Sequence, residues 1–249
     1  MSLYDLSKVS DYTKTNDFHN NTNISLRNKY LYFAVDKVAN SSVKNALFAI
    51  EYAPVGKTAV TLYDERSSPL LSPYQLDDDL LRTVLNSGNY FRFTFVRNPF
   101  TRLLSCYLDR ICTQTSNPRR YLNRYLKSHN ISAEEVTFEV FIRAICEQAS
   151  PVQNSHWRVQ YDDVLFERID YDYVGKFETL WTDMAFVSDK IWGSVRPEMS
   201  DSSVNKSPKI TNAGSRLAEF YTPELVELVV KRYEQDFRAF GYSTEITSA

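Results

Sequence analysis

Glycine and cysteine are both scarce in this chain. Only six of its 249 residues are glycine, and the phosphate-binding pattern G-x-x-x-x-G-K-[ST] is absent, which argues against an ordinary P-loop kinase. The three cysteines, Cys106, Cys112 and Cys146, include no C-x-x-C pair and cannot all be paired. We therefore expect reduced thiols in a cytoplasmic protein rather than a disulfide framework.

Long apolar runs are also missing. No stretch approaches the ~20 apolar residues that cross a bilayer, and the N-terminus, MSLYDLSKVSDYTK, lacks the apolar segment of a signal peptide. A membrane anchor that has been removed is compatible with this N-terminus. The net charge of −2 provides no basic field for nucleic acid. Histidine, cysteine and aspartate do not cluster at metal-ligand spacing, so we expect no metal site.

The segment Tyr30–Ile50, YLYFAVDKVANSSVKNALFAI, predicts a strand, a polar turn and a helix. Its first six residues are a continuous apolar and aromatic run, typical of a strand buried on both faces. From Val43 onward, apolar residues recur at helical spacing. Such a unit presents backbone N–H groups to an anion, and Lys37, Ser41 and Ser42 add a charge and two hydroxyls. Taken alone, the segment is explained more simply as an ordinary turn with a serine N-cap.

A second strand–turn–helix unit covers residues 90–111. Arg97 follows its strand, YFRFTFV, and Pro99 suits a first helical position. Ligands of an open parallel sheet bind outside the carboxyl ends of its strands, so Lys37 and Arg97 can hold two separated anionic groups. Arginine offers a fork to phosphate, and the Ser105 hydroxyl can close on the same group. Read singly, Arg97 is explained more simply by an ion pair and Ser105 by a helix contact.

Strands and helices alternate along the chain, which indicates an α/β fold. We expect one domain over residues 1–249, with residues 1–29 as an irregular N-terminal arm. Further strands are predicted near 59–63 and at 171–177. Further helices are predicted at 76–86, 119–127, 136–149, 179–191 and 222–240, with a break at Asn117-Pro118 and irregular segments at 153–163 and 193–215.

Four motifs occur in order: VDKVANSS (35–42), FVRNPFTRLLSCY (95–107), SHWRVQY (155–161) and YDYVGKFETL (171–180). Together they resemble the carbohydrate sulfotransferases that use 3′-phosphoadenosine 5′-phosphosulfate (PAPS), above all the branch of the chondroitin 4-O- and HNK-1 sulfotransferases. The resemblance covers residues 30–242, because the ending YTPELVELVVKRYEQDFRAFGY is also similar. It implies a P-loop-like three-layer α/β fold with a central parallel sheet flanked by helices. It also implies sulfuryl transfer to a hydroxyl group, which we expect to belong to a carbohydrate.

The resemblance also implies a role for each motif. The loop that starts at Lys37 would hold the 5′-phosphosulfate, and Arg97 would hold the 3′-phosphate that distinguishes this donor from ATP. Phe177 would lie near the adenine. The co-substrate would leave as adenosine 3′,5′-bisphosphate. The residues expected to bind it are Lys37, Val38, Ala39, Asn40, Ser41, Ser42, Arg97, Ser105, Phe177 and Lys206.

Sulfuryl transfer, like phosphoryl transfer, is an in-line displacement between oxygens. Charge on the leaving oxygen must be stabilised, which Lys37 can do. The acceptor hydroxyl must lose its proton, and His156, in the HW pair shared with the family, is the candidate base, because imidazole is neutral at physiological pH. A hydrogen-bonded loop histidine is the ordinary alternative. Glu178 is the second candidate base, although a structural ion pair explains it more simply.

One residue departs from the family pattern and keeps other functions open. The family usually has proline before the lysine, where this chain has Asp36, and a carboxylate there repels phosphosulfate unless it points away or pairs with a lysine. The alternatives are a P-loop-like kinase that depends on Mg²⁺ and ATP, and a degenerate protein that binds nucleotide or glycan without turnover.

The acceptor and the oligomeric state are not defined by the sequence. A basic aromatic face on the helix after the second motif can serve an anionic glycan, although charged helix faces are more often simply solvated. The residues of this face are Tyr107, Arg119, Arg120, Arg124 and Lys127.

Overall fold

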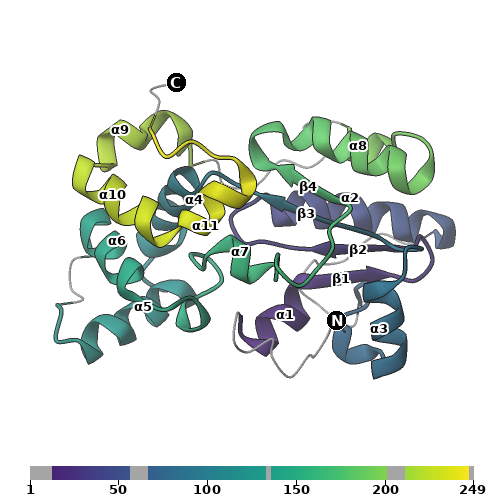
Figure 1. The fold of residues 1–249 in the computed structure, drawn as a ribbon, viewed down its shortest axis with the longest axis horizontal. Coiled ribbons are helices and arrows are strands. Elements are labelled where there is room, and N and C mark those ends of the chain that lie inside the picture. Colours follow the sequence, from purple (N-terminus) through teal and green to yellow (C-terminus); the bar gives the residue numbers. More distant parts are fainter. Residues whose placement is uncertain (1–12, 57–66, 133–135, 201–210, 247–249) are drawn as a thin grey trace. The chain divides into compact units, whose positions relative to one another are not determined.

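The computed structural model describes residues 13–56, 67–132, 136–200 and 211–246. Contacts between Cα atoms divide the chain into two compact units (Figure 1). The first comprises Met1–Val96 and Val164–Pro208, and the second comprises Arg97–Asp163 and Lys209–Ala249. The strands of the described residues all belong to the first unit.

The first unit contains a four-stranded sheet in the order β1-β2-β3-β4. Its strands are β1 (Thr22–Ser25), β2 (Tyr30–Phe33), β3 (Phe91–Val96) and β4 (Tyr173–Lys176). β2, β3 and β4 are parallel, whereas β1 pairs with β2 in the antiparallel sense. The predicted strands at 30–35, 90–96 and 171–177 are therefore confirmed, and so is a mostly parallel sheet. The antiparallel edge strand was not predicted.

Helices cover both faces of this sheet. The helices of the unit are α1 (Thr15–Asn21), α2 (Asn40–Tyr52), α3 (Asp78–Asn86) and α8 (Leu180–Trp192), with 3₁₀ turns η2 (Ala53–Val55), η4 (Pro73–Gln75), η7 (Phe177–Thr179) and η8 (Pro197–Met199). On one face, Tyr30 contacts Trp192 of α8 with ring centroids 5.8 Å apart. On the other, Leu31 and Phe33 form a core with the apolar side of α3. Side chains alternate along a strand, so the apolar run of β2 is what two buried faces require.

The N-terminal arm is more ordered than predicted. Residues 1–12 lie outside the described part, but α1 and β1 occupy residues 15–25, so the prediction of an irregular arm is wrong there. β1 has the polar sequence TNIS, yet all four residues are buried. Thr22 Oγ1 donates to the Phe18 carbonyl at 2.8 Å, and Asn23 Nδ2 donates to the Tyr32 carbonyl at 3.2 Å. Because these polar groups are paired, the strand forms without an apolar pattern. The strand predicted near 59–63 also lies outside the described residues.

The second unit is helical in its described part and surrounds an apolar core that includes Phe100, Phe141 and Trp157. Its elements are α4 (Pro99–Cys106), the π-helical turn η5 (Tyr107–Ile111), α5 (Asn117–Ser128), α6 (Phe138–Glu147), η6 (Ser150–Val152), α7 (Gln160–Asp163), η9 (Gly214–Arg216), α9 (Leu217–Phe220), α10 (Pro223–Arg232) and α11 (Glu234–Phe240). In the described parts of both units, every helix is too short or too polar to cross a membrane.

Two helix boundaries in this unit differ from the prediction. Pro118 does not break the chain but lies in the first turn of α5, where a missing N–H costs nothing. Ser116 caps this helix by accepting the Arg119 N–H at 3.1 Å. The single helix predicted over 222–240 is two helices, α10 and α11, separated at Tyr233 with φ −107° and ψ 24°. The predicted end at Gly241, which has φ 64°, is confirmed.

Candidate functional site

The turn after β2 adopts left-handed backbone conformations without any glycine. Lys37 has φ 69° and Ala39 has φ 52°, and Ala39 is the N-cap of α2. A left-handed residue followed by a right-handed one turns successive backbone N–H groups to the same side, which forms a concave anion-binding nest. A non-glycine residue in this conformation costs on the order of 1–3 kcal/mol. We call residues 37–42 the anion loop.

Helix α2 presents its N-terminus at the anion loop. Ala39 has no side-chain acceptor, so it leaves the helix without a side-chain cap, and the ordinary explanation of a serine N-cap is wrong. Ser42 lies inside the first turn, where its N–H donates to the Ala39 carbonyl at 2.8 Å. Val38 is fully buried, so it can offer a ligand its backbone only. The positive end of the helix dipole therefore reinforces an anion site here.

Two residues, Asn40 within the anion loop and Asp36 just before it, add polar oxygen atoms to this region. Asn40 Oδ1 is buried and has no hydrogen-bond partner among the described residues. Burial and, after it, the Asp36 carboxylate raise the pKa of the Tyr32 phenol. Asp36 therefore contributes negative charge at the root of the loop, beside β2.

Phe177 and Glu178 directly follow β4 in the same unit. Phe177 is half-buried and opens η7, whereas Glu178 is exposed. Gly175 is required just before them, because a Cβ there would lie 2.5 Å from the Phe95 ring of β3. β2 and β4 run parallel on either side of β3. The anion loop and Phe177 thus follow the carboxyl ends of strands at one edge of the sheet, where ligands of such sheets bind.

In the second unit, Arg97, Thr101 and Ser105 follow one another at intervals of four residues, from the residue after β3 into α4. Arg97 is 7% exposed, and its Nε donates to Thr101 Oγ1 at 3.0 Å. Thr101 and Ser105 are four residues apart and share one side of the helix. Ser105 Oγ accepts a hydrogen bond of 3.3 Å from Thr211 Oγ1. One guanidinium and three hydroxyls form a set suited to a phosphate or sulfate group. We call Arg97, Thr101, Ser105 and Thr211 the arginine row.

Gln160 fixes the backbone of Arg97 in both directions. Its Oε1 accepts the Arg97 N–H at 2.9 Å, and its Nε2 donates to the Arg97 carbonyl at 2.8 Å. Asp236 of α11 in turn accepts the backbone N–H groups of Gln160 and Tyr161 at 3.0 and 2.8 Å. Burial raises the pKa of the Asp236 carboxyl to about 6. The hydrogen bonds from Gln160 and Tyr161 favour the charged form and lower this pKa, but the effect of burial is larger. The position of Arg97 therefore depends on a buried carboxylate.

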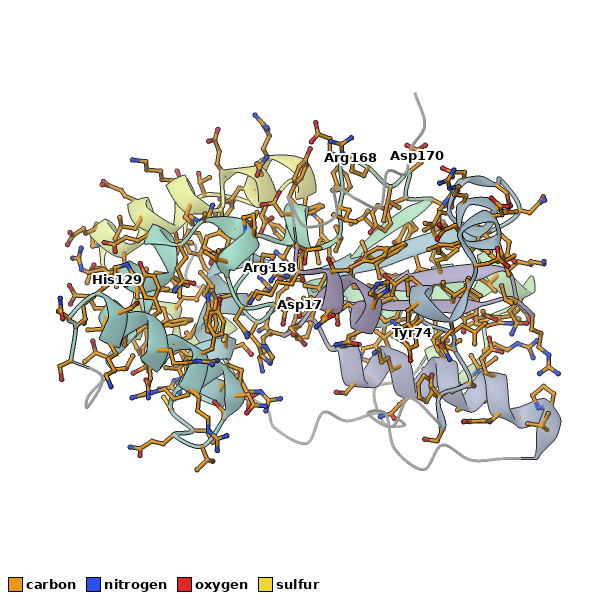
Figure 2. The ribbon with its side chains drawn as sticks, turned by 90° about the horizontal axis from the view of Figure 1, so that it is seen from below. Asp17, Tyr74, His129, Arg158, Arg168 and Asp170 are labelled. Atoms are coloured by element: carbon orange, nitrogen blue, oxygen red, sulfur yellow. The ribbon has the colours of Figure 1, made fainter. Side chains whose placement is uncertain are left out.

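His156 lies in the turn before α7 and is half-buried. Asn154 Oδ1 contacts both the His156 backbone N–H at 3.1 Å and ring Nδ1 at 3.0 Å. A carbonyl oxygen only accepts, so we infer from this partner that Nδ1 carries the proton and Nε2 the lone pair. That tautomer is the one a general base acting through Nε2 needs. His129, by contrast, is exposed at the end of α5, apart from the labelled Arg158 (Figure 2).

Buried arginines hold the turn of His156. Arg102 of α4 is 1% exposed and donates to the Ser155 and Arg158 carbonyls, both at 2.7 Å. The two carbonyls bracket His156 in the chain. Arg158 is fully buried and forms an ion pair of 2.7 Å with Asp163. Tyr233, at the break between α10 and α11, donates to the Trp157 carbonyl at 2.6 Å. The turn is thus fixed by charge-assisted bonds to its backbone.

The predicted site residues fall into two groups. Arg97, Ser105 and His156 belong to the second unit, where α4 and Gln160 connect the arginine row to the turn of His156. The anion loop and Phe177 belong to the first unit. Lys206 lies outside the described residues.

Sequence reasoning missed Thr101, Gln160 and Arg102. For Thr101 a signal was present, because positions 97, 101 and 105 repeat at helical spacing. Gln160 and Arg102 act through partners more than 50 residues away in the chain, and a sequence pattern does not reveal such pairs.

The basic aromatic face needs correction. Arg119 is buried, where its Nε donates to Asn123 Oδ1 at 2.8 Å and its Nη1 to the Ile111 carbonyl at 2.9 Å. The Tyr107 hydroxyl donates to the Val136 carbonyl at 3.2 Å. Both residues therefore stabilise the fold. The residues of this face that remain exposed are Arg120, Arg124 and Lys127. In the described part of the chain, no three histidine, cysteine or acidic residues gather as metal ligands would.

Comparison with known proteins finds relatives of this chain. The family model described as "Sulfotransferase family" matches residues 20–243. The zebrafish (Danio rerio) carbohydrate sulfotransferase 14 is 26% identical over 222 residues, which cover 86% of this chain and 60% of that relative. The mouse (Mus musculus) protein of the same name is 30% identical over 166 residues, or 64% of this chain and 43% of the relative.

A relative with a different name gives a similar result. Carbohydrate sulfotransferase 10 of Xenopus laevis is 24% identical over 246 residues, which cover 88% of this chain and 66% of that relative. The chain thus spans between about two fifths and two thirds of the length of these relatives. No solved structure matches the chain.

Proposed function

Because the chain belongs to the sulfotransferase family, we propose that it transfers a sulfuryl group from PAPS to a hydroxyl group of a carbohydrate. The names of the relatives, carbohydrate sulfotransferases 10 and 14, support the carbohydrate as acceptor. We further propose a P-loop-like three-layer fold that acts as a single domain. The family match supports this, because residues 20–243 run through both compact units. A cytoplasmic location stays a prediction.

The donor supplies an activated sulfuryl group and carries two anionic ends. The anion loop would hold the 5′-phosphosulfate with the Lys37 ammonium, the backbone N–H groups of the nest and the N-terminus of α2. The arginine row would hold the 3′-phosphate, and Phe177 would lie against the adenine. Lys206 is proposed to contact the nucleotide on the strength of the family resemblance alone.

Sulfuryl transfer needs a positive charge near the leaving oxygen and a base near the acceptor hydroxyl. Lys37 would stabilise negative charge as it develops on the leaving oxygen, and a point charge suits this task. His156 Nε2 would accept the proton of the acceptor hydroxyl, while Asn154 holds Nδ1–H and so keeps the tautomer. Arg102 acts through the backbone of the turn and is a positioning residue.

The arginine row is the observation that supports PAPS, and not ATP, as the donor. A kinase that uses ATP has no need for a guanidinium–hydroxyl site for a 3′-phosphate, whereas PAPS requires one. Titration calorimetry with adenosine 3′,5′-bisphosphate, ADP and ADP plus Mg²⁺ tests this. We expect the bisphosphate to bind more tightly, without Mg²⁺. Equal affinity for ADP, or binding that depends on Mg²⁺, contradicts the proposal.

A further inference from the structure

Asp236 of α11 is a buried carboxylate with no role in the proposed reaction steps. It is fully buried, and α11 is in contact with α7 (Figure 1). Its Oδ2 accepts the Gln160 N–H at 3.0 Å and Gln160 Nε2–H at 3.2 Å, and its Oδ1 accepts the Tyr161 N–H at 2.8 Å. All three donors belong to α7, and a charged carboxylate, which only accepts, matches all of them.

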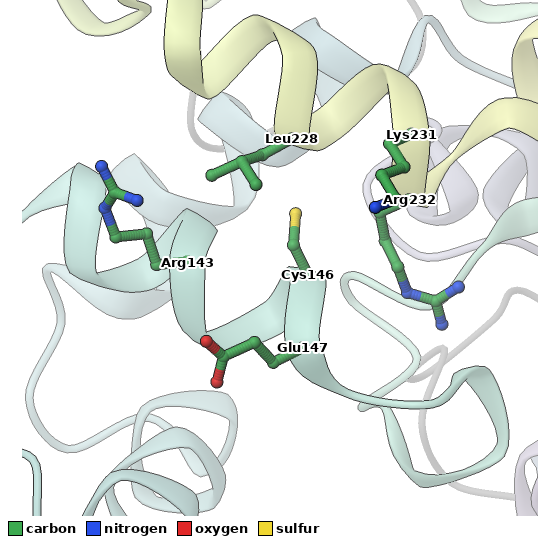
Figure 3. A pocket seen from close by; sticks show the side chains of 6 residues that line it. All are labelled: Arg143, Cys146, Glu147, Leu228, Lys231 and Arg232. Carbon is green, nitrogen blue, oxygen red and sulfur yellow. The ribbon is translucent and has the colours of Figure 1, made fainter.

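Two other ionisable side chains interact with Asp236. Burial raises the pKa of Asp236 most, and the positive charge of Arg102 of α4 lowers it. Burial likewise raises the pKa of the Tyr233 phenol most, and Asp236 adds to the rise. The cavity of about 310 Å³ between α6 and α10 (Figure 3) has Arg232 in its lining but neither Asp236 nor Gln160. The charge of Asp236 is therefore stabilised by α7 and Arg102 and not by the contents of that cavity.

The carboxylate of Asp236 favours one orientation of the Gln160 amide. A side-chain amide can turn over and exchange its oxygen and nitrogen, and its hydrogen-bond partners decide which orientation is stable. Nε2 must face Asp236, because an amide oxygen there would meet a carboxylate. The same Nε2 then donates to the Arg97 carbonyl at 2.8 Å, and Oε1 accepts the Arg97 N–H at 2.9 Å. Asp236 thus favours the orientation that both backbone groups of Arg97 require.

Arg97 needs this support because it lies between two regular elements. It follows β3, which ends at Val96, and precedes α4, which begins at Pro99. Buried backbone N–H and carbonyl groups need partners, and the single side chain of Gln160 bonds both groups here. When these two bonds are lost, the backbone of Arg97 is freer to rotate, and its guanidinium moves with it.

We propose that Asp236 is a positioning residue that acts through Gln160 to hold Arg97 where its guanidinium meets a phosphate, and so sets the preference for a 3′-phosphate. The identity of that phosphate rests on the proposed function. The positioning of Arg97 by Asp236 rests on the hydrogen bonds alone and can be tested without a nucleotide.

The first test measures the preference for adenosine 3′,5′-bisphosphate over 5′-AMP by titration calorimetry. Asp236→Asn presents an amide donor to the donors of α7, and Gln160→Met removes both bonds to Arg97 at similar volume. We expect each variant to lower the preference roughly tenfold and to leave the affinity for 5′-AMP nearly unchanged. Gln148→Met is the matched control, because this buried glutamine accepts the Trp157 indole N–H at 3.1 Å. It should lose stability and keep the preference.

The second test reads the backbone amide of Arg97 by NMR. We expect its proton shift in the parent to titrate near pH 6, as Asp236 takes up a proton, and its hydrogen exchange to be faster in Gln160→Met. His156 can also titrate near neutral pH, but Asp236→Asn keeps it, so the component lost in this variant belongs to Asp236. Should Asp236→Asn fail to fold, Gln160→Met and the titration of the parent decide the question.

The two tests separate this proposal from the proposed function. If the parent binds both nucleotides equally, the donor assignment fails, and the Arg97 amide alone then decides whether Asp236 positions Arg97. An Arg97 amide that does not respond to pH in the parent overturns the proposal in either case. An unchanged preference in Gln160→Met also overturns it, when the parent prefers the bisphosphate.

Discussion

Replacing Arg97 by alanine tests the donor site most directly. The backbone of Arg97 is held by Gln160 through its N–H and carbonyl groups, and alanine keeps both. The substitution therefore removes the guanidinium and its bond to Thr101 while the main chain stays in place. Any change in ligand preference can then be assigned to the side chain.

The size of the effect follows from the number of bonds to a charged group. One hydrogen bond to a charged partner contributes roughly 1.5–3 kcal/mol, or about 12- to 150-fold in affinity. The parent protein should prefer adenosine 3′,5′-bisphosphate over 5′-AMP by at least this factor. Arg97→Ala should lose most of the preference and leave the affinity for 5′-AMP nearly unchanged. Titration calorimetry at one fixed ionic strength measures both, since salt screens phosphate contacts.

Two further variants calibrate this result. Thr101→Val removes the neutral partner that orients Arg97 and should cost about 0.5–1.5 kcal/mol, or roughly 2- to 12-fold, on the bisphosphate only. Arg82→Ala removes an exposed arginine of α3 and should leave both affinities unchanged. The reasoning is refuted if the parent binds the two nucleotides equally. It is also refuted if Arg97→Ala keeps the preference of the parent.

Three other predictions concern catalysis and stability. Lys37→Ala should reduce kcat far more than nucleotide affinity, Lys37→Arg should restore little, and near-normal turnover in Lys37→Ala would show that the loop is structural. His156→Ala should lose about 10²–10⁴-fold in kcat with unchanged bisphosphate affinity and Tm, and parental rates would transfer the role of base to Glu178. The carboxyl of Asp236 has a pKa of about 6 when folded, against a usual value of 3.8, so the folded state takes up its proton first as pH falls. The free energy of unfolding from this group should therefore rise by roughly 2 kcal/mol from pH 7 to pH 4. In urea titrations Asp236→Asn should lack that component, and an identical pH profile would contradict it.

The sequence predicted those parts of the fold that depend on local patterns. β2 was visible because two buried faces require a continuous apolar run, β3 was visible in the alternation of its phenylalanines, and the start of α10 was visible in its cap, Thr222. β1 was not visible, since Asn23 and its neighbours are polar and are satisfied by hydrogen bonds within the fold. The break at Tyr233 was hidden for a similar reason, because its hydroxyl bonds a carbonyl 76 residues away.

In the candidate site, too, some residues were visible in the sequence and others depended on contacts that the sequence does not show. Arg97 and Ser105 were both predicted from the sequence. In the structure Arg97 bonds Thr101, which lies four residues before Ser105, and Ser105 is bonded by Thr211. Arg119 was misassigned to a surface, because charge alone does not reveal that a guanidinium has buried acceptors such as the Ile111 carbonyl. The hydrogen-bond partners that the fold gives a charged side chain decide such cases.

The glycine-free turn at Lys37 and Ala39 changes how the anion loop meets its ligand. A glycine-rich loop samples many conformations and loses that freedom when an anion orders it. Here the side chains narrow the conformations of the loop beforehand, and β2 and α2 impose its left-handed geometry during folding. Less conformational entropy is then lost on binding. The loop is therefore preorganised for the anion, and its ability to bind depends on the folding of β2 and α2.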